Sequence, residues 1–273
     1  MADFSKNVLI TDLDGTLLPH SKILNEKDLR AIEYFKANGG IFTVATGRIL
    51  QATEQFFGDL KPNASVIMNN GGLIYDTAAK KAVYSVFLDS AAVEYTKKMM
   101  EHFPEIGVEI NTMDEIFVVR MSELERCHLD MTHLPYTEVS FEEVPKDGWC
   151  KVLFSIDPDK MHLLEEYTAE MGWDKTDFVA SGAFLFECLP KGCTKGSALK
   201  KLAELQGWGD YTISAAGDYD NDLAMLEFAD ISFAPQNAKN NVKEAASCVT
   251  AATCNEGAIA EAIEYIEKEC KVK

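Results

Sequence analysis

Residues 7–17, Asn-Val-Leu-Ile-Thr-Asp-Leu-Asp-Gly-Thr-Leu, lead an apolar run directly into two carboxylates, Asp12 and Asp14. A strand that ends at Leu13 and turns at Asp14-Gly15 would place both acids beside one pocket, at the carboxyl edge of a sheet. Open α/β sheets bind their ligands at that edge. Asp-Gly pairs also occur in ordinary turns, so the stretch alone also fits a buried strand closed by a turn. Residues farther along the chain decide between these interpretations.

The composition indicates an acidic globular protein. The chain has 273 residues, of which 47% are hydrophobic and 26% charged, which allows a sizeable core and favours two domains. The formal net charge is -18, which argues against non-specific binding to nucleic acid or to an anionic membrane surface. An acidic protein that handles an anionic substrate must supply local cations, from a metal ion, lysine or arginine.

The termini and the cysteines indicate a cytoplasmic protein without a membrane segment. Residues 1–6 lack the apolar core of a signal peptide, and no apolar run approaches the roughly 20 residues of a membrane helix. The seven cysteines are scattered and form no Cys-x-x-Cys pair, which favours reduced thiols over disulfides or a zinc site. We infer no protein partner from these features.

The first part of the chain alternates strands and helices, as parallel α/β domains do. After the opening strand, the pattern predicts a helix over 25–36, a strand over 40–45, a helix to about residue 57 and a strand over 64–68. Asn69-Asn70-Gly71-Gly72 follow the last of these strands. Residues 73–76 and 82–88 predict a hairpin, so we expect the chain to leave the α/β domain there.

Residues 88–187 predict a second, inserted domain of α+β type with antiparallel strands. Its predicted elements are helices over 90–102, 122–131 and 159–171, and strands over 107–121, 149–156 and 177–189. The α/β rhythm then resumes with helices over 196–205, 221–228, 238–246 and 256–269, and strands over 211–216, 230–234 and 248–251. We therefore predict an α/β fold whose Rossmann-like parallel-sheet domain, residues 1–87 and 188–273, is interrupted by the insert.

Two polar residues at the start of predicted helices could hold an anion. Thr46 follows the second strand, so its hydroxyl and the Gly47 amide could face an anion; alternatively, Thr46 is the N-cap of the next helix. Lys195 begins an amphipathic helix, where a cation opposes the helix dipole by a few tenths to about 1 kcal/mol. A bound anion would remove this misfit, whereas a solvated surface lysine is the usual alternative.

A second acidic cluster, Gly217-Asp218-Tyr219-Asp220-Asn221-Asp222, lies between a predicted strand and a predicted helix. Acids at alternate positions suggest a calcium loop, but the sixth position is Leu223 and not glycine, and the twelfth is Ala229 and not glutamate. What remains is a site for a hard cation with few protein ligands. Such a site suits Mg²⁺, which keeps its own waters and binds a substrate phosphate.

Four segments of the chain together resemble the haloacid dehalogenase (HAD) superfamily. In order, they are Asp12-x-Asp14-Gly15-Thr16, Ala45-Thr46-Gly47-Arg48, Thr194-Lys195-Gly196 and Gly217-Asp218-x-x-Asn221-Asp222. Each motif alone is common, whereas the ordered set is highly specific. The insert, together with Pro235-Gln236-Asn237-Ala238 and Glu256-Gly257, resembles the Cof-type branch with a large α/β cap (type IIB). The resemblance covers nearly the whole chain and is weakest between about 88 and 180.

The resemblance implies a Mg²⁺-dependent phosphatase of small phosphorylated metabolites, such as sugar phosphates, with residues 88–187 as its cap. Asp12 would be the nucleophile that forms an aspartyl phosphate, and Asp14 would be the general acid and then the base. The groups implied to hold the phosphoryl oxygens are Thr46, Lys195, Asn221 and the amides of Leu13 and Gly47. The implied Mg²⁺ ligands are the Asp12 carboxylate, the Asp14 carbonyl oxygen and Asp218, with Asp222 directly or through water.

Three other functions fit parts of the pattern. A phosphomutase would use the same aspartyl phosphate and return the phosphoryl group to a sugar. A signalling receiver domain also groups acids, threonine and lysine, but the chain is far too long for it and the cluster at 218–222 has no place there. A binding module without activity is disfavoured because every expected chemical group is present. Residues that could line a substrate cleft are Arg48, Arg120, Tyr136 and Phe184.

Overall fold

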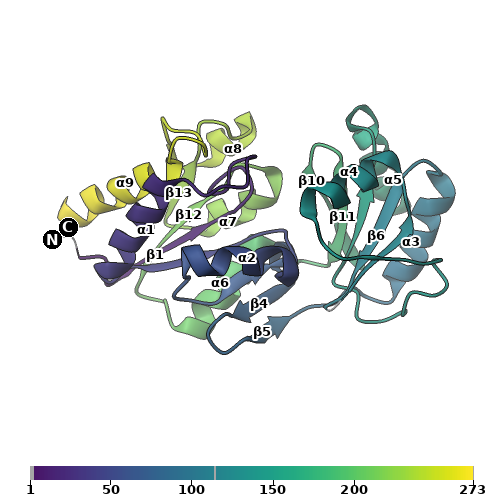
Figure 1. Cartoon of the computed structure of the whole chain (residues 1–273), viewed down its shortest axis with the longest axis horizontal. Coiled ribbons are helices and arrows are strands. Elements are labelled where there is room, and N and C mark those ends of the chain that lie inside the picture. The colour runs from purple at the N-terminus through teal and green to yellow at the C-terminus, as the bar shows by residue number, and fades with distance from the viewer. Residues whose placement is uncertain (1–2, 114, 273) are drawn as a thin grey trace. The chain divides into compact units, whose positions relative to one another are not determined.

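The chain, as a computed structural model that describes residues 3–113 and 115–272, packs into two units (Figure 1). We call the first the core unit; it comprises the chain up to Gly47, Thr53–Tyr84 and the chain from Thr194 onward. We call the second the cap unit; it comprises Arg48–Ala52 and Ser85–Cys193. An α/β fold interrupted by an insert is therefore confirmed.

The core unit is built on a parallel sheet of five strands. In the order of the sheet these are β14 (Cys248–Val249), β13 (Ile231–Ala234), β12 (Thr212–Ala216), β1 (Asn7–Thr11) and β2 (Ile41–Val44). Strand β1 pairs in parallel with β12 on one side and with β2 on the other, so their carboxyl ends lie side by side. Val8, Leu9 and Ile10 are fully buried, which explains the uninterrupted apolar run before Asp12.

The helices of the core unit alternate with these strands, as in other α/β folds. They are α1 (Glu26–Ala37), α2 (Leu50–Leu60), α6 (Lys195–Gln206), α7 (Leu223–Phe228), α8 (Asn240–Ala245) and α9 (Ala258–Val272), although the first turn of α2 groups with the cap unit. Helix α1 lies where we predicted it, because the Asn25 side chain accepts a hydrogen bond from Lys27 N–H at 2.8 Å and caps its first turn.

Among the described residues, no helix has both the length and the apolar character that a membrane-spanning segment requires.

A small antiparallel sheet lies where we predicted a third strand and a hairpin. Its strands are β3 (Val66–Met68), β4 (Leu73–Asp76) and β5 (Lys81–Ser85). A bridge between Ala45 and Ile67 connects β3 to the end of β2, and the chain then reverses in a 3-10 turn at Asn69–Gly71. Strand β3 therefore runs parallel to β2, and the chain leaves the parallel order at the turn that follows β3.

The cap unit contains a six-stranded sheet. In order, its strands are β10 (Thr176–Gly182), β11 (Leu185–Pro190), β9 (Lys151–Ser155), β6 (Gly107–Asn111), β7 (Ile116–Arg120) and β8 (Thr137–Glu138). Neighbouring strands are antiparallel except β7 and β8. Helices α3 (Ala91–His102) and α5 (Met161–Met171) pack on one face in an apolar cluster with Val108 and Phe154. Along each strand, the side chains that alternate with Val108 and Phe154 point to the other face of the sheet. Helix α4 (Glu123–Thr132) packs on that face.

The boundaries of the two units differ from the predicted 87/88 and 187/188. The chain leaves the cap unit after Cys193, because β11 continues to Pro190. Arg48–Ala52 lies outside 88–187 but groups with the cap unit. The reason is an apolar cluster in which Ile49 and Ala52 pack with Ile116, Val118 and Leu129.

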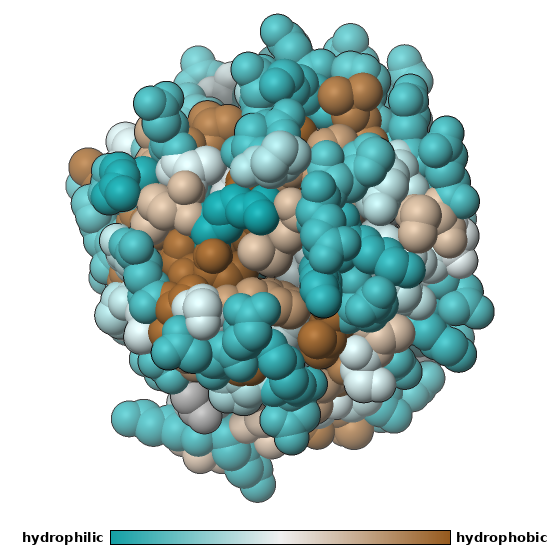
Figure 2. Space-filling model, turned by 90° about the vertical axis from the view of Figure 1, so that its right-hand side faces the viewer, coloured by the Kyte–Doolittle hydropathy of each residue, from teal (hydrophilic) through white to brown (hydrophobic). Residues whose placement is uncertain are grey.

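The face of the molecule drawn in Figure 2 is mostly hydrophilic, with brown apolar side chains between the teal ones. This distribution is expected for a chain with 44 acidic and 26 basic residues. Apolar side chains scattered over such a face are normal for a folded protein and do not by themselves mark a binding surface.

Candidate active site

Polar residues follow the carboxyl ends of the adjacent strands β1, β2 and β12. Asp12 comes after β1, Thr46 after β2, and Asp218 after β12. The pairing of β1 with β12 continues to Asp12, whose N–H donates a hydrogen bond to Ala216 O at 2.8 Å. Motifs that are far apart in the chain therefore meet at the edge where open α/β sheets bind ligands.

Lys195, the first residue of α6, is buried between two carboxylates. Its Nζ lies 2.6 Å from Asp12 Oδ1 and 2.6 Å from Asp222 Oδ1, and the lysine side chain is 1% exposed. The helix begins there because Thr194 and Ser197 form a capping box, in which each side chain accepts a hydrogen bond from the backbone N–H of the other. The alternative of a solvated surface lysine is therefore wrong.

Burial and the ion pairs together set the charges of these groups. Burial raises the pKa of Asp12 well above its ordinary range, and the ammonium of Lys195 partly opposes this rise. Burial alone would lower the pKa of Lys195, but the carboxylates of Asp12 and Asp222 outweigh it and raise that pKa. The lysine stays charged, and its charge favours the ionised form of Asp12, which is the form that a nucleophile requires.

Asp218 and Asp222 make different contacts in the loop after β12. Asp222 Oδ2 accepts hydrogen bonds from the N–H groups of Asp218 and Tyr219 at 2.9 and 3.0 Å, while its Oδ1 accepts one from Lys195. Asp218 Oδ1 accepts a hydrogen bond from the Thr16 hydroxyl at 2.7 Å. Burial, followed by the charge of Asp222, raises the pKa of Asp218 to about 7. Asp222 therefore shapes the loop, and Asp218 presents a carboxylate that needs a further positive partner.

The carboxylates of Asp12, Asp218 and Asp222 can share a metal ion. One oxygen from each lies within 4.8 Å of the others. Carboxylate oxygens are the donors that hard divalent cations prefer, and such a cation relieves the repulsion between buried acids. The donor set therefore fits a hard divalent cation. Because Asp222 accepts hydrogen bonds at both oxygens, Asp12 and Asp218 are the better direct ligands.

Asp14 lies apart from these buried acids. Its side chain is 40% exposed, and its Oδ1 is 2.5 Å from Lys22 Nζ. The turn that follows requires glycine, because Gly15 has φ 87° and a Cβ there would lie 2.4 Å from Asp218 Oδ2. Asn237 supports the same turn by donating from Nδ2 to Gly15 O at 2.7 Å. The Asp14 carboxylate is thus accessible to a leaving group or a water molecule.

The remaining predicted side chains of the site meet around the turn after β3. Thr46 is buried, and its carbonyl oxygen accepts a hydrogen bond from Asn70 N–H at 3.1 Å. Asn221 donates from Nδ2 to Asn70 Oδ1 at 2.8 Å. Helix α2 begins only at Leu50, so the interpretation of Thr46 as its N-cap is wrong.

Leu13 and Gly47 take part through their backbones. The Leu13 side chain is fully buried, and its carbonyl oxygen accepts hydrogen bonds from the N–H groups of Leu17 and Leu18, which shape the turn after β1. Gly47 packs against Asn70, since a Cβ at position 47 would lie 3.0 Å from Asn70 Oδ1. Both positions therefore depend on close backbone packing next to the acids.

Sequence reasoning gave no role to four side chains that make these contacts: Thr16, Lys22, Asn70 and Asn237. Thr16 carried a signal, because it is a hydroxyl residue inside the first motif. Asn237 also carried one, because it belongs to the segment 235–238 that contributes to the family resemblance. No local pattern marks Lys22 or Asn70, and the contact of Asn70 with Asn221 spans 151 positions of sequence. Conversely, Arg120, a candidate for the substrate cleft, donates to the carbonyl oxygens of Met100 and Phe103 inside the cap unit.

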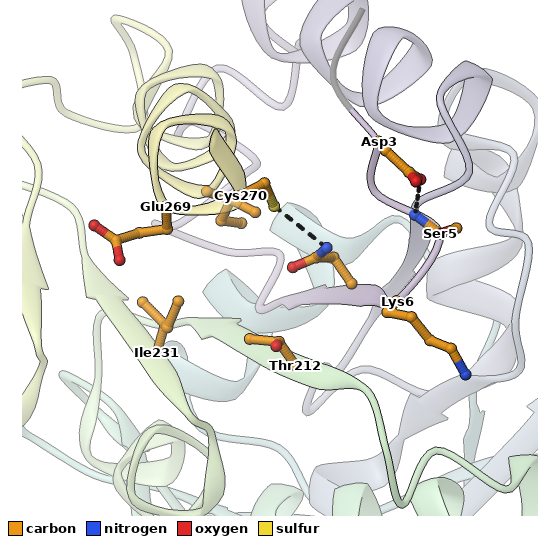
Figure 3. A pocket seen from close by; sticks show the side chains of 9 residues that line it. Asp3, Ser5, Lys6, Thr212, Ile231, Glu269 and Cys270 are labelled. Atoms are coloured by element: carbon orange, nitrogen blue, oxygen red, sulfur yellow. Dashed lines mark hydrogen bonds between the residues drawn. The ribbon is translucent and has the colours of Figure 1, made fainter. Parts of the chain in front are cut away.

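A cavity of about 260 Å³ lies at the opposite end of the core sheet (Figure 3). Its lining includes Lys6 and Asn7 at the start of β1, and Thr212 and Ile231 at the starts of the neighbouring strands. Asn7 Nδ2 there donates to Cys270 Sγ at 3.4 Å. Since ligands of open α/β sheets bind at the carboxyl edge, we place the active site at the acids and not in this cavity.

Residues 9–263 match the family of haloacid dehalogenase-like hydrolases. The chain belongs to this family. The superfamily and the hydrolase class that the four motifs indicate are thereby confirmed, and the haloacid dehalogenase-like fold accounts for the parallel sheet and its insert.

Relatives of this haloacid dehalogenase-like hydrolase are phosphatases by name. One is 5-amino-6-(5-phospho-D-ribitylamino)uracil phosphatase YwtE of Bacillus subtilis (strain 168), 26% identical over 266 residues, or 88% of this chain and 91% of the relative. Pyridoxal phosphate phosphatase YbhA of Escherichia coli (strain K12) is 26% identical over 262 residues, or 89% and 92%. Among solved structures, the HAD subclass IIB sugar phosphatase BT4131 has the same fold, with a TM-score of 0.83, 22% identity, and coverage of 95% of this chain and 98% of its own.

Proposed function

We propose that this hydrolase removes phosphate from small phosphorylated metabolites, with Mg²⁺ as cofactor and an aspartyl phosphate on Asp12 as intermediate. The observation that carries the proposal is the buried ion pair of 2.6 Å between Asp12 and Lys195 at the carboxyl end of β1. It places beside the proposed nucleophile a cation that favours the ionised form of Asp12 and can bind phosphate. Relatives named as phosphatases of pyridoxal phosphate and of a phosphoribitylamino-uracil support substrates of this size and class.

The first half-reaction transfers the phosphoryl group to the enzyme. A carboxylate oxygen of Asp12 attacks phosphorus, the bond from phosphorus to the ester oxygen breaks, and Asp14 donates a proton to the departing alcohol. The partly exposed position of Asp14 supports this role, since its carboxyl is open to the leaving group. For that step, the Asp14 carboxyl exchanges its contact with Lys22 for one with the substrate.

The second half-reaction returns the enzyme to its starting state. Asp14, now ionised, takes a proton from a water molecule, which attacks phosphorus and displaces the Asp12 carboxylate as orthophosphate forms. Positioning and charge neutralisation contribute more to this chemistry than bond-making by the protein. The groups proposed to hold the phosphoryl oxygens are Lys195, the Thr46 hydroxyl, the Asn221 amide and the N–H groups of Leu13 and Gly47.

A divalent cation fits the same site. When bound, Mg²⁺ would neutralise the negative charge that accumulates between phosphate and the acids. Its proposed ligands are the Asp12 carboxylate, the Asp14 carbonyl oxygen and Asp218. Asp222 is proposed to act through a water molecule, because both its oxygens already accept hydrogen bonds from the protein.

Rapid-mixing experiments with p-nitrophenyl phosphate test the two aspartate roles separately. Asp14→Asn keeps the backbone carbonyl but removes the proton-transfer group, so steady turnover should fall by roughly 10² to 10⁴-fold. The nitrophenolate leaving group needs little protonation, so Asp12 should still be phosphorylated. We expect a burst near one equivalent of nitrophenolate per site, with phosphate trapped on Asp12.

Asp12→Asn removes the nucleophilic oxygen and should show no burst with any substrate. Asp220→Asn is the matched control, since Asp220 belongs to the same loop but pairs with Lys239 at 2.5 Å. It should behave as the unchanged protein does. A burst from Asp12→Asn, or phosphate found on another residue, would overturn the assignment of nucleophile and acid.

A further inference from the structure

The turn Asn69–Gly71, which follows β3, has an unusual backbone. Asn69 and Asn70 both have φ 52°, and Gly71 has φ 106°. Left-handed backbone is unfavourable for residues with a Cβ, and asparagine is among the few that tolerate it. Both asparagines are buried, with 3% and 1% of their surface exposed. Three successive residues with positive φ, two of them asparagines with a Cβ, indicate that the surrounding structure holds the turn in this conformation.

The turn contacts three of the four motifs of the site. Asn70 N–H donates to Thr46 O in the second motif, at 3.1 Å. Gly71 packs on the third motif, since a Cβ there would lie 2.3 Å from Thr194 O. Asn70 Oδ1 accepts a hydrogen bond of 2.8 Å from Asn221 in the fourth motif. The turn is therefore a common support for loops that arrive from distant parts of the chain.

The Asn70 amide lies between two of the groups proposed to hold phosphate. On one side its Oδ1 fixes the Asn221 amide, and on the other it packs against Gly47, where a Cβ would lie 3.0 Å from Oδ1 and 3.1 Å from Nδ2. Asn221 is only partly buried, so without this hydrogen bond its side chain could turn to several rotamers. Immobilising a free side chain when a ligand binds weakens binding.

We infer that Asn70 is a positioning residue, whose amide holds the Asn221 side chain in the orientation that binds the phosphoryl group. This inference rests on the proposed function, because it assigns Asn221 to phosphate. Asn70 itself acts through Asn221 and needs no contact with the substrate. The same packing explains why position 47 carries no side chain.

The decisive variant is Asn70→Gly, which keeps the left-handed backbone and removes only the amide. With Mg²⁺ present, the inhibition constant of inorganic phosphate and the KM for p-nitrophenyl phosphate should both rise about two- to tenfold, from the ordering of one side chain. The kcat should change less, since Asn221 would hold the phosphoryl group equally in the ground state and the transition state. Urea unfolding should be nearly unchanged, because glycine removes backbone strain at this position.

Asn69→Gly is the matched control. Asn69 shares the turn and the φ of 52°, but its Oδ1 has no hydrogen-bond partner among the described residues. This variant should keep the phosphate affinity of the unchanged protein. An equal loss in both variants would assign the effect to the backbone of the turn and reject the role of the Asn70 amide.

A double-mutant cycle tests whether Asn70 acts through Asn221. In an Asn221→Ala background, Asn70→Gly should weaken phosphate inhibition by less than twofold, because the group it orients is already gone. A full additional loss in that background would contradict the inference.

A measurement that needs no catalysis separates this inference from the proposed function. In ¹⁵N NMR spectra, the side-chain NH₂ signal of Asn221 should move in Asn70→Gly and stay in place in Asn69→Gly. If the unchanged protein hydrolysed no phosphate ester with Mg²⁺, the proposed function would fail, and the NMR comparison would still decide the contact. An Asn221 signal unaffected by Asn70→Gly would overturn the inference.

Discussion

At the scale of single residues, Lys195 shows how a charge can be held inside the protein. The sequence marks it as a lysine at the start of a helix, where the dipole disfavours it. The structure places two carboxylates, Asp12 and Asp222, within 2.6 Å of its Nζ. The sequence predicts the membership of this cluster through the four motifs. It does not predict which acid contacts the lysine, because that depends on how α6 packs against the loop after β12.

Removing the lysine should therefore destabilise the protein. Lys195→Met leaves two buried acids without their cation, and breaking a buried ion pair in this way costs about 3–5 kcal/mol. We expect the free energy of unfolding in urea, measured without added metal, to fall by about this amount. Lys200→Met, an exposed position on the same helix, should change it by less than about 0.5 kcal/mol. Equal stabilities of the two variants would show that the ion pairs contribute nothing net.

The acids themselves predict the dependence on metal. Asp12, Asp218 and Asp222 offer few protein ligands to a hard cation, a situation that suits Mg²⁺ with its retained waters. Turnover should cease in EDTA and return with Mg²⁺. Calcium should restore little, because its looser and larger coordination fits in-line transfer poorly. Full turnover in EDTA would refute the metal assignment.

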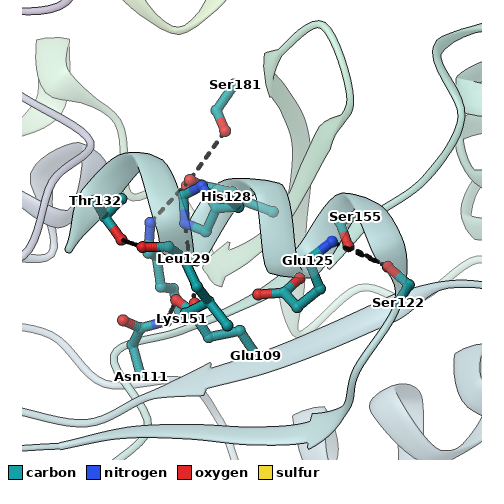
Figure 4. Close-up of polar contacts among 11 residues, drawn as sticks. Glu109, Asn111, Ser122, Glu125, His128, Leu129, Thr132, Lys151, Ser155 and Ser181 are labelled. Atoms are coloured by element: carbon teal, nitrogen blue, oxygen red, sulfur yellow. Dashed lines mark hydrogen bonds and ion pairs between the residues drawn. The ribbon is translucent and has the colours of Figure 1, made fainter. Parts of the chain in front are cut away.

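At the scale of elements, the cap unit contains a buried polar cluster between α4 and its sheet (Figure 4). Lys151 Nζ lies 2.9 Å from Glu187 Oε1, and Asn111 Nδ2 donates to Glu109 at 2.6 Å. Glu125 on α4 is fully buried, and its carboxyl group faces the carboxyl group of Glu109 and the hydroxyl group of Ser155. Burial, and then the charge of Glu109, raises the pKa of Glu125 to about 8.

This cluster should make the stability of the protein depend on pH. In the unfolded chain Glu125 titrates near 4.5, and in the folded chain near 8, so between these values the folded state holds a proton that the unfolded state releases. The free energy of unfolding should therefore fall as the pH rises from about 5 to about 8. In Glu125→Gln, the decrease in the free energy of unfolding over this pH range should be smaller by more than about 1 kcal/mol, since one pKa unit corresponds to about 1.4 kcal/mol.

The control is Glu123→Gln, an exposed glutamate in the first turn of the same helix. Urea unfolding at several pH values, for both variants and the unchanged protein, isolates the contribution of Glu125 from those of the other buried acids. A Glu125→Gln variant with the original pH profile would show that its carboxyl does not hold the proton.

The elements also show where prediction from sequence succeeds. Helices α1 and α6 begin within one residue of their predicted positions, because capping side chains and apolar spacing are local signals. Strand β8 was missed, since Thr137–Glu138 is short, exposed and without an apolar pattern. The role of Asn70 was missed for a different reason. Asn-Asn-Gly-Gly is typical of any turn, and the contact with Asn221 spans 151 positions of sequence.

At the scale of the whole molecule, we propose that the core unit carries out the reaction and that the inserted cap unit selects the substrate. All proposed catalytic residues belong to the core unit, and the cap unit has its own sheet and apolar core. Replacing residues 86–192 with a short linker should therefore lower activity toward the physiological substrate more than activity toward p-nitrophenyl phosphate. Steady-state kinetics on a folded variant would measure this. An equal loss toward both substrates would mean that the cap unit supplies catalytic groups.

The order of the central sheet has a consequence for synthesis on the ribosome. Strand β1 is synthesised long before its partner β12, because the entire insert lies between them, as the pairing of Asn7 with Thr212 shows. At about 5–20 residues per second, roughly 10–40 s pass before β12 becomes available. Throughout that interval one edge of a strongly apolar strand has no partner, and unpaired edges of this kind favour association between chains. We therefore expect the nascent chain to be more prone to association, and so to need chaperones more, than the folded enzyme.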